Sequence, residues 1–239
     1  MCNLYALTHS RTAVIRWFGV PDNRAAQFEP LTSIFPGHEA PVLRAAPDGT
    51  LGLSLMNWGF VLPQTGKAPK RVTNVRDDRI QTSRFWTDSF EERRCLVPAS
   101  SYCEPSEERP ARWHWFALKG EDHRPLFAFP GIWRRWKGAV RKDGPIVEQE
   151  MFAFLTTSPN SLTATINHER MPVLLSSPED WKLWLSGTNS EALSLARSFE
   201  PEDMQIVRSG TRKADSEERT EFDASGDILA IPGMQMKLI

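Results

Sequence analysis

The apolar segments of this 239-residue chain are short, and Pro, Gly or charged residues interrupt them. No window holds the roughly 18 consecutive apolar residues that a membrane-spanning helix requires. Short apolar runs bounded by turn-forming residues are instead typical of β-strands. We expect a strand at each of five such runs, which lie at residues 71–75, 94–99, 113–118, 126–133 and 152–157.

A turn sequence predicts one β-hairpin. Pro-Asp-Gly at residues 47–49 separates two further strand-like segments, 41–46 and 51–60. The leucines of the second segment alternate with other residues, as they do in a half-buried strand.

Helices are expected at intervals between the strands. Ser10 can cap a short amphipathic helix that Gly19 ends, after an opening strand. Ser-Pro-Glu at residues 177–179 has the pattern of a second helix start, and a third helix is expected within residues 190–199.

This order of elements favours an α+β fold over a strict alternation of strand and helix. We expect residues 1–211 to form a single domain with a curved, barrel-like, mostly antiparallel β-sheet flanked by short helices. Residues 212–239 are rich in charge near their start and show little periodicity, which predicts a mobile C-terminal extension.

The charge of the chain is balanced overall but uneven along its length. There are 29 Lys and Arg against 30 Asp and Glu, a net charge of -1, which excludes a uniformly basic surface. About four excess acids at residues 200–223 offset a basic stretch at residues 109–142. Aromatic residues interleave with that basic stretch, so it is either a surface on which single-stranded bases stack or a strand core with arginines outside. The pattern favours the core.

The three cysteines form no Cys-x-x-Cys pair, and the histidines show no ligand spacing. We therefore expect neither a disulfide framework, a metal site nor a cofactor. Free thiols and the absence of a secretory apolar region at the N-terminus predict a cytoplasmic protein.

One cysteine is notable for its position. Cys2 follows the initiator Met1, so removal of that methionine creates an amine and a thiol on adjacent carbons. Such a 1,2-aminothiol reacts with an aldehyde, first through a Schiff base and then by closing a thiazolidine ring. A cysteine at position 2 can also be incidental.

Three other polar residues stand where apolar ones would be expected. Glu104 ends a strand-like run, and a carboxylate there is either solvated or a general acid/base with a raised pKa. Asn74 lies inside a strand-like run, where it can orient an amine or mark a turn. His168 precedes a buried strand, where it is either a structural residue or a catalyst.

Four short motifs occur in a fixed order along the chain: Met1-Cys2, Asn74-Val75-Arg76, Tyr102-Cys103-Glu104 and His168-Glu169-Arg170-Met171-Pro172. As an ordered set they resemble the SOS response-associated peptidase family, whose members process abasic sites. The resemblance runs from residue 1 to about Gly187. It implies an α+β domain whose mature N-terminal cysteine forms a thiazolidine crosslink with an abasic site in single-stranded DNA, shielding the lesion from strand scission.

The resemblance also implies roles for individual residues. Cys2 matches the nucleophile, Asn74 the residue that orients its amine, Glu104 a general acid/base and His168 the group that assists opening of the deoxyribose ring. Contacts with the DNA are implied for a further set of positions, namely Arg76, Arg84 and Arg170 at the backbone and Pro36, Trp58 and Thr156 on the base side. The implied partner is single-stranded DNA that contains abasic sites. The protein is expected to be a monomer in the cytoplasm, to lie at the nucleoid when it is bound to DNA, and to have no membrane partner.

The chain departs from the family pattern in three places. Asn3 and Leu4 stand where Gly-Arg is common, Pro105 replaces an aromatic residue, and an expected acid is represented by Asp77 or Asp78.

Two alternatives stay open. One is a cysteine-type peptidase using Cys2 and His168, with removal of Met1 as its own reaction. The other is a non-catalytic single-strand binder using the basic aromatic stretch. A lyase activity of the crosslinking protein is a further possibility.

Overall fold

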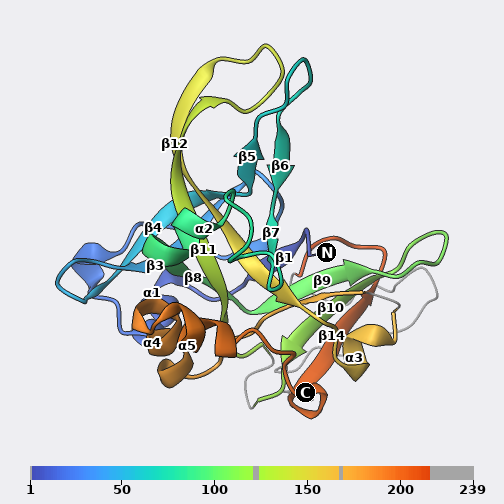
Figure 1. Ribbon diagram of the computed structural model, residues 1–239. Helices are drawn as coiled ribbons and strands as arrows, with labels where there is room; N and C mark the ends of the chain where they lie inside the picture. Colours follow the sequence, from blue (N-terminus) through green and yellow to red (C-terminus); the bar gives the residue numbers. More distant parts are fainter. Residues whose placement is uncertain (1, 121–123, 167–168, 216–239) are drawn as a thin grey trace, which may run out of the picture.

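The computed structural model describes residues 2–120, 124–166 and 169–215, and it shows an α+β fold with short helices packed against curved sheets (Figure 1). The predicted fold class is confirmed. Within the described residues, no helix is long and apolar enough to cross a membrane.

Five strands close into a barrel. They are β3 (Glu39–Ala45), β4 (Leu51–Trp58), β8 (Arg94–Ala99), β11 (Phe127–Ala139) and β12 (Ile146–Thr157), in the order β11-β8-β3-β4-β12, and β11 pairs with β12 to complete the ring. The pairs are antiparallel except β4 with β12, which is parallel. The C-terminal residues of β12 also pair with β7 (Asn74–Arg76) and β13 (Met171–Pro172).

A second, antiparallel sheet lies beside the barrel. Its order is β14 (Met204–Gly210), β10 (Trp113–Leu118), β9 (Ser101–Pro105), β1 (Tyr5–Leu7) and β2 (Leu31–Ile34). The two sheets share one core, in which the Tyr5 ring of β1 lies 5.0 Å from Trp58, 5.5 Å from Phe129 and 5.9 Å from Phe154, all edge-on. Edge-on aromatic packing stabilises this junction and holds β1 against the barrel.

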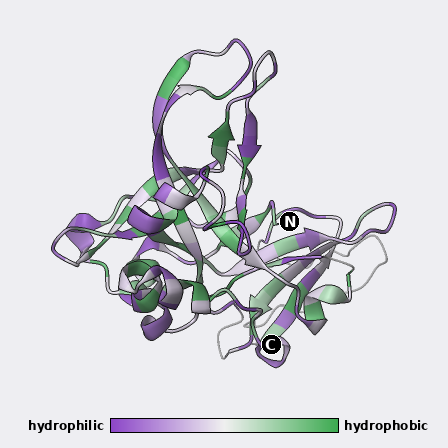
Figure 2. Ribbon diagram, in the orientation of Figure 1, coloured by the Kyte–Doolittle hydropathy of each residue, from purple (hydrophilic) through white to green (hydrophobic). Residues whose placement is uncertain are grey.

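A small hairpin of β5 (Phe60–Leu62) and β6 (Lys70–Val72) projects from the body together with the outer halves of β11 and β12 (Figure 1). Figure 2 shows β5 as hydrophobic and β6 as largely hydrophilic, consistent with one strand packing inward. Gly59 makes the turn into β5 with φ 102°, and a Cβ there would lie 2.5 Å from the Arg71 side chain. Glycine is therefore required at this bend.

Short helices flank the two sheets (Figure 1). α1 (Arg11–Phe18) begins at Ser10, whose hydroxyl accepts from the Ala13 amide, and ends at Gly19 with φ 68°. α2 (Thr87–Glu92) and α4 (Pro178–Ser186) pack on β8 and β11. The remaining short helices are α3 (Ser161–Ala164), α5 (Asn189–Ser194) and two 3-10 turns, Asp22–Arg24 and Pro201–Asp203.

The predicted hairpin and the two capped helices are confirmed, whereas three boundaries differ. The strand expected at 71–75 is broken at Thr73, because β6 pairs with β5 while β7 pairs with β12. β11 and β12 extend well beyond the expected segments, since each supports the other in the projecting hairpin. The helix expected to reach residue 199 ends at Ser194.

The chain beyond the expected domain boundary is anchored as far as Asp215. Its carboxylate is fully buried and receives hydrogen bonds at 2.6 Å from both Nε and Nη2 of Arg124. Ser101 donates to the same carboxylate at 2.5 Å. Asp215, which the sequence placed in the C-terminal extension, is therefore held against the domain; residues 216–239, the rest of that extension, lie outside the described residues.

Candidate active site

Cys2 lies just before β1 and is fully buried. Its thiol donates to the Leu4 carbonyl at 3.5 Å. Burial, followed by the charge of nearby Glu104, raises the pKa of this thiol well above its ordinary value. A thiol in this setting is protonated at neutral pH and is not poised as a thiolate.

Asn74 holds the backbone of Cys2 in place. β7 places Asn74 opposite Phe154 of the barrel, and its Nδ2 donates to the Cys2 carbonyl at 2.7 Å. The same Nδ2 donates to the Thr73 hydroxyl at 2.8 Å, which in turn donates to Asn3 Oδ1 at 3.0 Å. Asn74 Oδ1 is buried, and no group among the described residues donates to it. This oxygen is thus available to accept from an amine at Cys2.

Glu104 reaches the same place from β9. The Cys103 amide donates to the Leu4 carbonyl at 2.9 Å, which sets this end of β9 beside the residues that follow Cys2. Glu104 is 1% exposed, and burial raises the pKa of its carboxyl to about 8. A carboxyl with that pKa is largely protonated at neutral pH and can both donate and accept a proton there.

The three cysteines occupy different environments. Cys2 lies in the main core, whereas Cys103 lies in a small separate cluster with Leu4, Ala6 and Trp115 on the other face of the sheet. All three thiols are free, and burial raises the pKa of Cys95 and Cys103 as well. Only Cys2 combines a thiol with a position where an α-amine can form.

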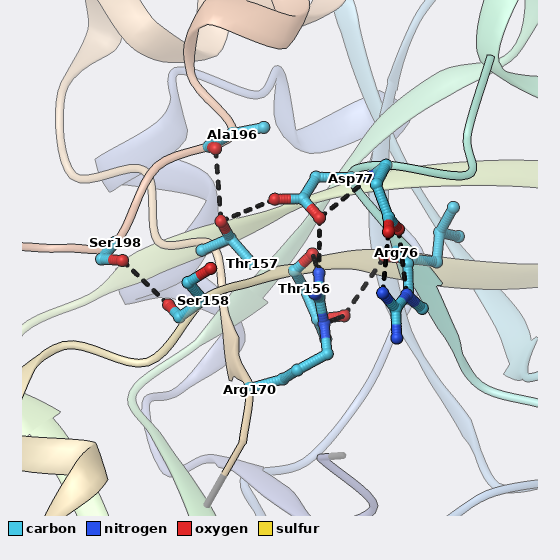
Figure 3. Close-up of polar contacts among 10 residues, drawn as sticks. Arg76, Asp77, Thr156, Thr157, Ser158, Arg170, Ala196 and Ser198 are labelled. Carbon is cyan, nitrogen blue, oxygen red and sulfur yellow. Dashed lines mark hydrogen bonds and ion pairs between the residues drawn. The ribbon is translucent and has the colours of Figure 1, made fainter.

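A network of ion pairs lies at the end of β7 (Figure 3). Arg170 donates from Nη2 to Asp77 Oδ1 at 2.6 Å and to the Thr156 carbonyl, and from Nε to the Thr156 hydroxyl at 3.2 Å. Thr157 donates to the other carboxylate oxygen of Asp77 at 2.7 Å. Asp77 thus ties β7, β12 and the segment around residue 170 together.

Asp78 has a different partner. Arg76 donates to it from Nε at 2.9 Å and from Nη2 at 2.7 Å. This hydrogen-bonded guanidinium lowers the pKa of Asp78 to about 2. Both side chains are about half exposed, at 50% and 51%.

The sequence-predicted site residues fall into separate groups. Cys2, Asn74 and Glu104 are brought together, and His168 lies outside the described residues. Arg76 and Arg84 are exposed.

The expected base-side residues are mostly not at the surface. Trp58 and Thr156 are fully buried, and Pro36 is half-buried. Trp58 packs in the core and donates to the Thr73 carbonyl at 3.1 Å, so in this structure it supports Asn74 rather than facing solvent.

The basic aromatic stretch is mainly core. Trp115, Phe116, Phe127 and Phe129 are fully buried, as strand alternation predicts when one face is covered. These four rings offer no surface for stacking on bases.

Comparison with known proteins identifies the family of this chain. The family model described as SOS response associated peptidase (SRAP) matches residues 1–212. The chain belongs to the SRAP family. The family description associates it with the SOS response, and so with DNA damage.

Solved structures share the SRAP fold of this chain. A crystal structure of a protein from Bacteroides thetaiotaomicron has 23% identity and a TM-score of 0.66, covering 87% of this chain and 92% of its own. A protein from Bordetella bronchiseptica has 16% identity and a TM-score of 0.67, and the match covers 85% of this chain and 97% of its own. A phage-related protein from the same organism has 19% identity and a TM-score of 0.63, and the match covers 85% of this chain and 92% of its own. No curated protein sequence matches the chain significantly.

Two contacts at the site of this SRAP protein were not indicated by the sequence, although Asp77 was named there as one of two acids for a family position. Thr73 bridges Asn74 and Asn3, and its place beside Asn74 was the available signal. Asp77 receives Arg170 across 93 residues of sequence, and no local pattern indicates that pairing.

Proposed function

We propose that this SRAP protein, after loss of Met1, forms a covalent thiazolidine crosslink between Cys2 and the aldehyde of an abasic site in single-stranded DNA. The observation that carries the proposal is the convergence of three groups at one buried point. Asn74 bonds to Cys2 at 2.7 Å, and the charge of Glu104 acts on the Cys2 thiol. An amide, a carboxyl and a 1,2-aminothiol are the groups that this reaction requires.

The reaction begins at the Cys2 amine. Neutral amine adds to the aldehyde carbon of the open sugar, forming a C–N bond, and the resulting carbinolamine loses water to give an imine. Asn74 Oδ1, which is buried without a donor among the described residues, can hold an N–H of this amine toward the aldehyde. The Cys2 carbonyl is already held by Nδ2 of the same side chain, so the amide orients the nucleophile at two points.

Glu104 moves the protons. With its pKa at about 8, it is mostly the neutral acid at pH 7 and can protonate the departing hydroxyl of the carbinolamine. The resulting carboxylate then accepts the proton of the thiol as sulfur attacks the imine carbon. The ring closes with one C–S bond formed, the nitrogen, which is an iminium after loss of the protonated hydroxyl, keeps its hydrogen as the ring N–H, Glu104 is returned to its acid form, and one water is released overall.

The raised pKa of the Cys2 thiol argues against a peptidase mechanism. Cysteine peptidases hold their nucleophile as a thiolate beside a cationic group, which lowers the thiol pKa. Here burial and the nearby carboxyl act in the opposite direction. A reaction that begins at the amine and uses the thiol second suits this environment better.

The test is incubation of the Met1-free protein with a single-stranded oligonucleotide carrying one abasic site. We expect an adduct that survives denaturing electrophoresis and whose mass is the sum of both partners less one water. Cys2→Ala is expected to give none. Cys2→Ser keeps the amine but not the thiol, so it is expected to give an imine that persists only after borohydride reduction.

Cys103→Ser is the matched control, because Cys103 is also a buried free thiol but lies in the separate cluster. Full adduct is expected with this variant. Absence of adduct in the unsubstituted protein, or undiminished adduct in Cys2→Ala, would overturn the proposal.

A further inference from the structure

A pocket of about 400 Å³ lies between α2, the turn that precedes it and β11. Four arginines line it, namely Arg84, Arg93, Arg134 and Arg135, and we call it the arginine pocket. Asp88 is the one acid in its lining among the described residues. Four guanidinium groups around so small a volume make the pocket strongly attractive to an anion.

Arg134 is the inner wall of the arginine pocket. Its guanidinium lies 4.2 Å from the Phe60 ring centre and 4.5 Å from that of Phe85, and Nη2 donates to the Val61 carbonyl at 2.7 Å. Nε is buried, and no acceptor among the described residues reaches it. Burial and the charge of Arg93 lower the pKa of Arg134 to about 10, so the side chain is still a cation at neutral pH. No acid of the described residues thus compensates the Arg134 cation, and a partly buried cation without a counter-charge favours binding of an anion nearby.

The protein's own acids only partly offset this charge. Arg93 pairs with Glu92 at 2.5 Å, and Arg135 lies 3.5 Å from Glu150, which Arg44 also engages at 2.9 Å. Within the part of the chain that the structure describes, Arg84 and Arg134 have no ion pair. The pocket therefore retains positive charge at its inner wall and at its rim.

The aromatic residues of the pocket do not favour a nucleobase. The Trp133 ring is covered by the Arg44 guanidinium at 4.6 Å, and Phe85 is covered by Arg134. One face of each ring is thus occupied by a guanidinium, and charge and N–H donors predominate in the lining of the pocket. This favours a phosphate group over a base or a whole nucleotide.

We propose that the arginine pocket binds one phosphate of the DNA backbone, and thereby extends the contact of the protein with the damaged strand beyond the abasic sugar. The inference rests on the proposed function for the identity of the polyanion. Two connections link the pocket to the strands that carry the site. Arg134 bonds to β5, whose partner β6 ends two residues before Asn74, and exposed Arg84 follows the same strand β7.

The test is binding of an unmodified single-stranded oligonucleotide over a series of salt concentrations, in the Cys2→Ala background. Each phosphate contact on a single strand contributes about 0.7 to the slope of log K against log salt. Arg134→Gln is expected to reduce that slope by about 0.7 and to weaken binding about tenfold. Arg135→Gln changes an exposed side chain of the same pocket, so it is expected to reduce the slope without affecting the fold.

Arg16→Gln on α1 is the matched control, since Arg16 is exposed, carries the same charge and lies outside the pocket. Its slope is expected to equal that of the unsubstituted protein. Unchanged slopes in both pocket variants, or an equal loss in Arg16→Gln, would overturn the proposal. A second measurement follows the melting temperature of the protein with and without inorganic phosphate. If phosphate stabilises the unsubstituted protein but not Arg134→Gln, while the salt slopes of DNA binding are the same in both, the pocket binds a small anion and the DNA assignment is wrong.

The two proposals can fail separately. The binding measurement uses DNA without an abasic site and a protein without the Cys2 thiol, so it does not depend on crosslinking. A protein that binds DNA through the arginine pocket but forms no adduct would remove the proposed function and leave the pocket assignment standing.

Discussion

The buried point around Cys2 and the ion-pair network at the end of β7 use polar residues in opposite ways. At Cys2, Asn74 and Glu104, the groups are removed from water, and the pKa values of the thiol and the carboxyl are both raised. At the network, Asp77 and Asp78 are each matched by an arginine. The buried groups are therefore neutral near pH 7 and can exchange protons, whereas the network keeps its charges.

The two regions are only a few residues apart along β7, since Asn74 begins the strand and Asp77 follows it. The two regions differ because their side chains are buried to different extents. Asn74 is 6% exposed, whereas the Arg76 side chain is half exposed. In the proposed reaction the buried carboxyl exchanges protons, whereas the ion-pair network holds together the strands that surround it.

The largest expected effect concerns the pH dependence of stability, which Glu104 should dominate. Its carboxyl pKa rises from an ordinary 4.5 to about 8 on folding. Its contribution is therefore complete below the unfolded pKa and is lost as pH rises through the folded one. At about 1.4 kcal/mol for each pH unit, the loss amounts to several kcal/mol.

Urea unfolding at about pH 5 and about pH 8.5 measures this difference. The free energy of unfolding should fall with pH in the unsubstituted protein and much less in Glu104→Gln. Glu39→Gln alters an exposed carboxylate of β3 and should retain the full decline. If Glu104→Gln shows the same decline as the unsubstituted protein, the carboxyl is not the buried titrating group and the contrast between the two regions is lost.

The second expected effect is on the crosslinking rate. Glu104→Gln preserves the shape of the side chain but removes its proton transfer, and general acid/base catalysis contributes about 100-fold or more. Single-turnover adduct formation with excess protein should therefore slow by about that factor at pH 7, while the final amount of adduct stays the same. A rate within about twofold of the unsubstituted protein would assign the proton transfers to another group.

Local patterns predicted the strands and caps well, because their causes are local. Ser10, Gly19 and the turn at 47–49 act within a few residues of themselves, and each element lies where the pattern placed it. The break at Thr73 was not predicted, since it results from which partners β6 and β7 find rather than from their own residues.

The site itself could be predicted only in part, for the same reason. The types of residue at Cys2, Asn74 and Glu104 were unusual enough to single out. The hydrogen bond from Asn74 to Cys2, however, joins positions 72 residues apart, and it depends on the pairings of β7 with β12 and of β1 with β9. The burial of Arg134 is likewise tertiary. Strand alternation places Arg134 and Trp136 on one face, but only the packing of β11 on β5 shows that this face is covered.

The smallest expected effect separates two adjacent acids at the end of β7. Asp77 accepts from Arg170 and Thr157, and the Arg170 and Asp77 side chains are only 13% and 24% exposed. Asp77→Asn should leave a partly buried guanidinium without its counter-charge, which costs about 1 to 2 kcal/mol of unfolding free energy. Asp78→Asn removes a solvent-exposed pair with Arg76, so its unfolding midpoint should not change measurably.

Urea unfolding measures the free energy of unfolding of both variants and of the unsubstituted protein. The two residues are neighbours and the chemical change is the same in each, so the variants can be compared directly. Equal losses would mean that exposure does not distinguish the two ion pairs, and a larger loss in Asp78→Asn would reverse their assigned roles. The expected order, with Asp77→Asn the less stable, follows because the Asp77 carboxylate joins three chain segments while Asp78 engages a neighbour two residues away. Water can solvate the half-exposed Arg76 once Asp78 is replaced, whereas the largely buried Arg170 loses its counter-charge without that compensation, so removal of the Asp77 charge is the more costly change.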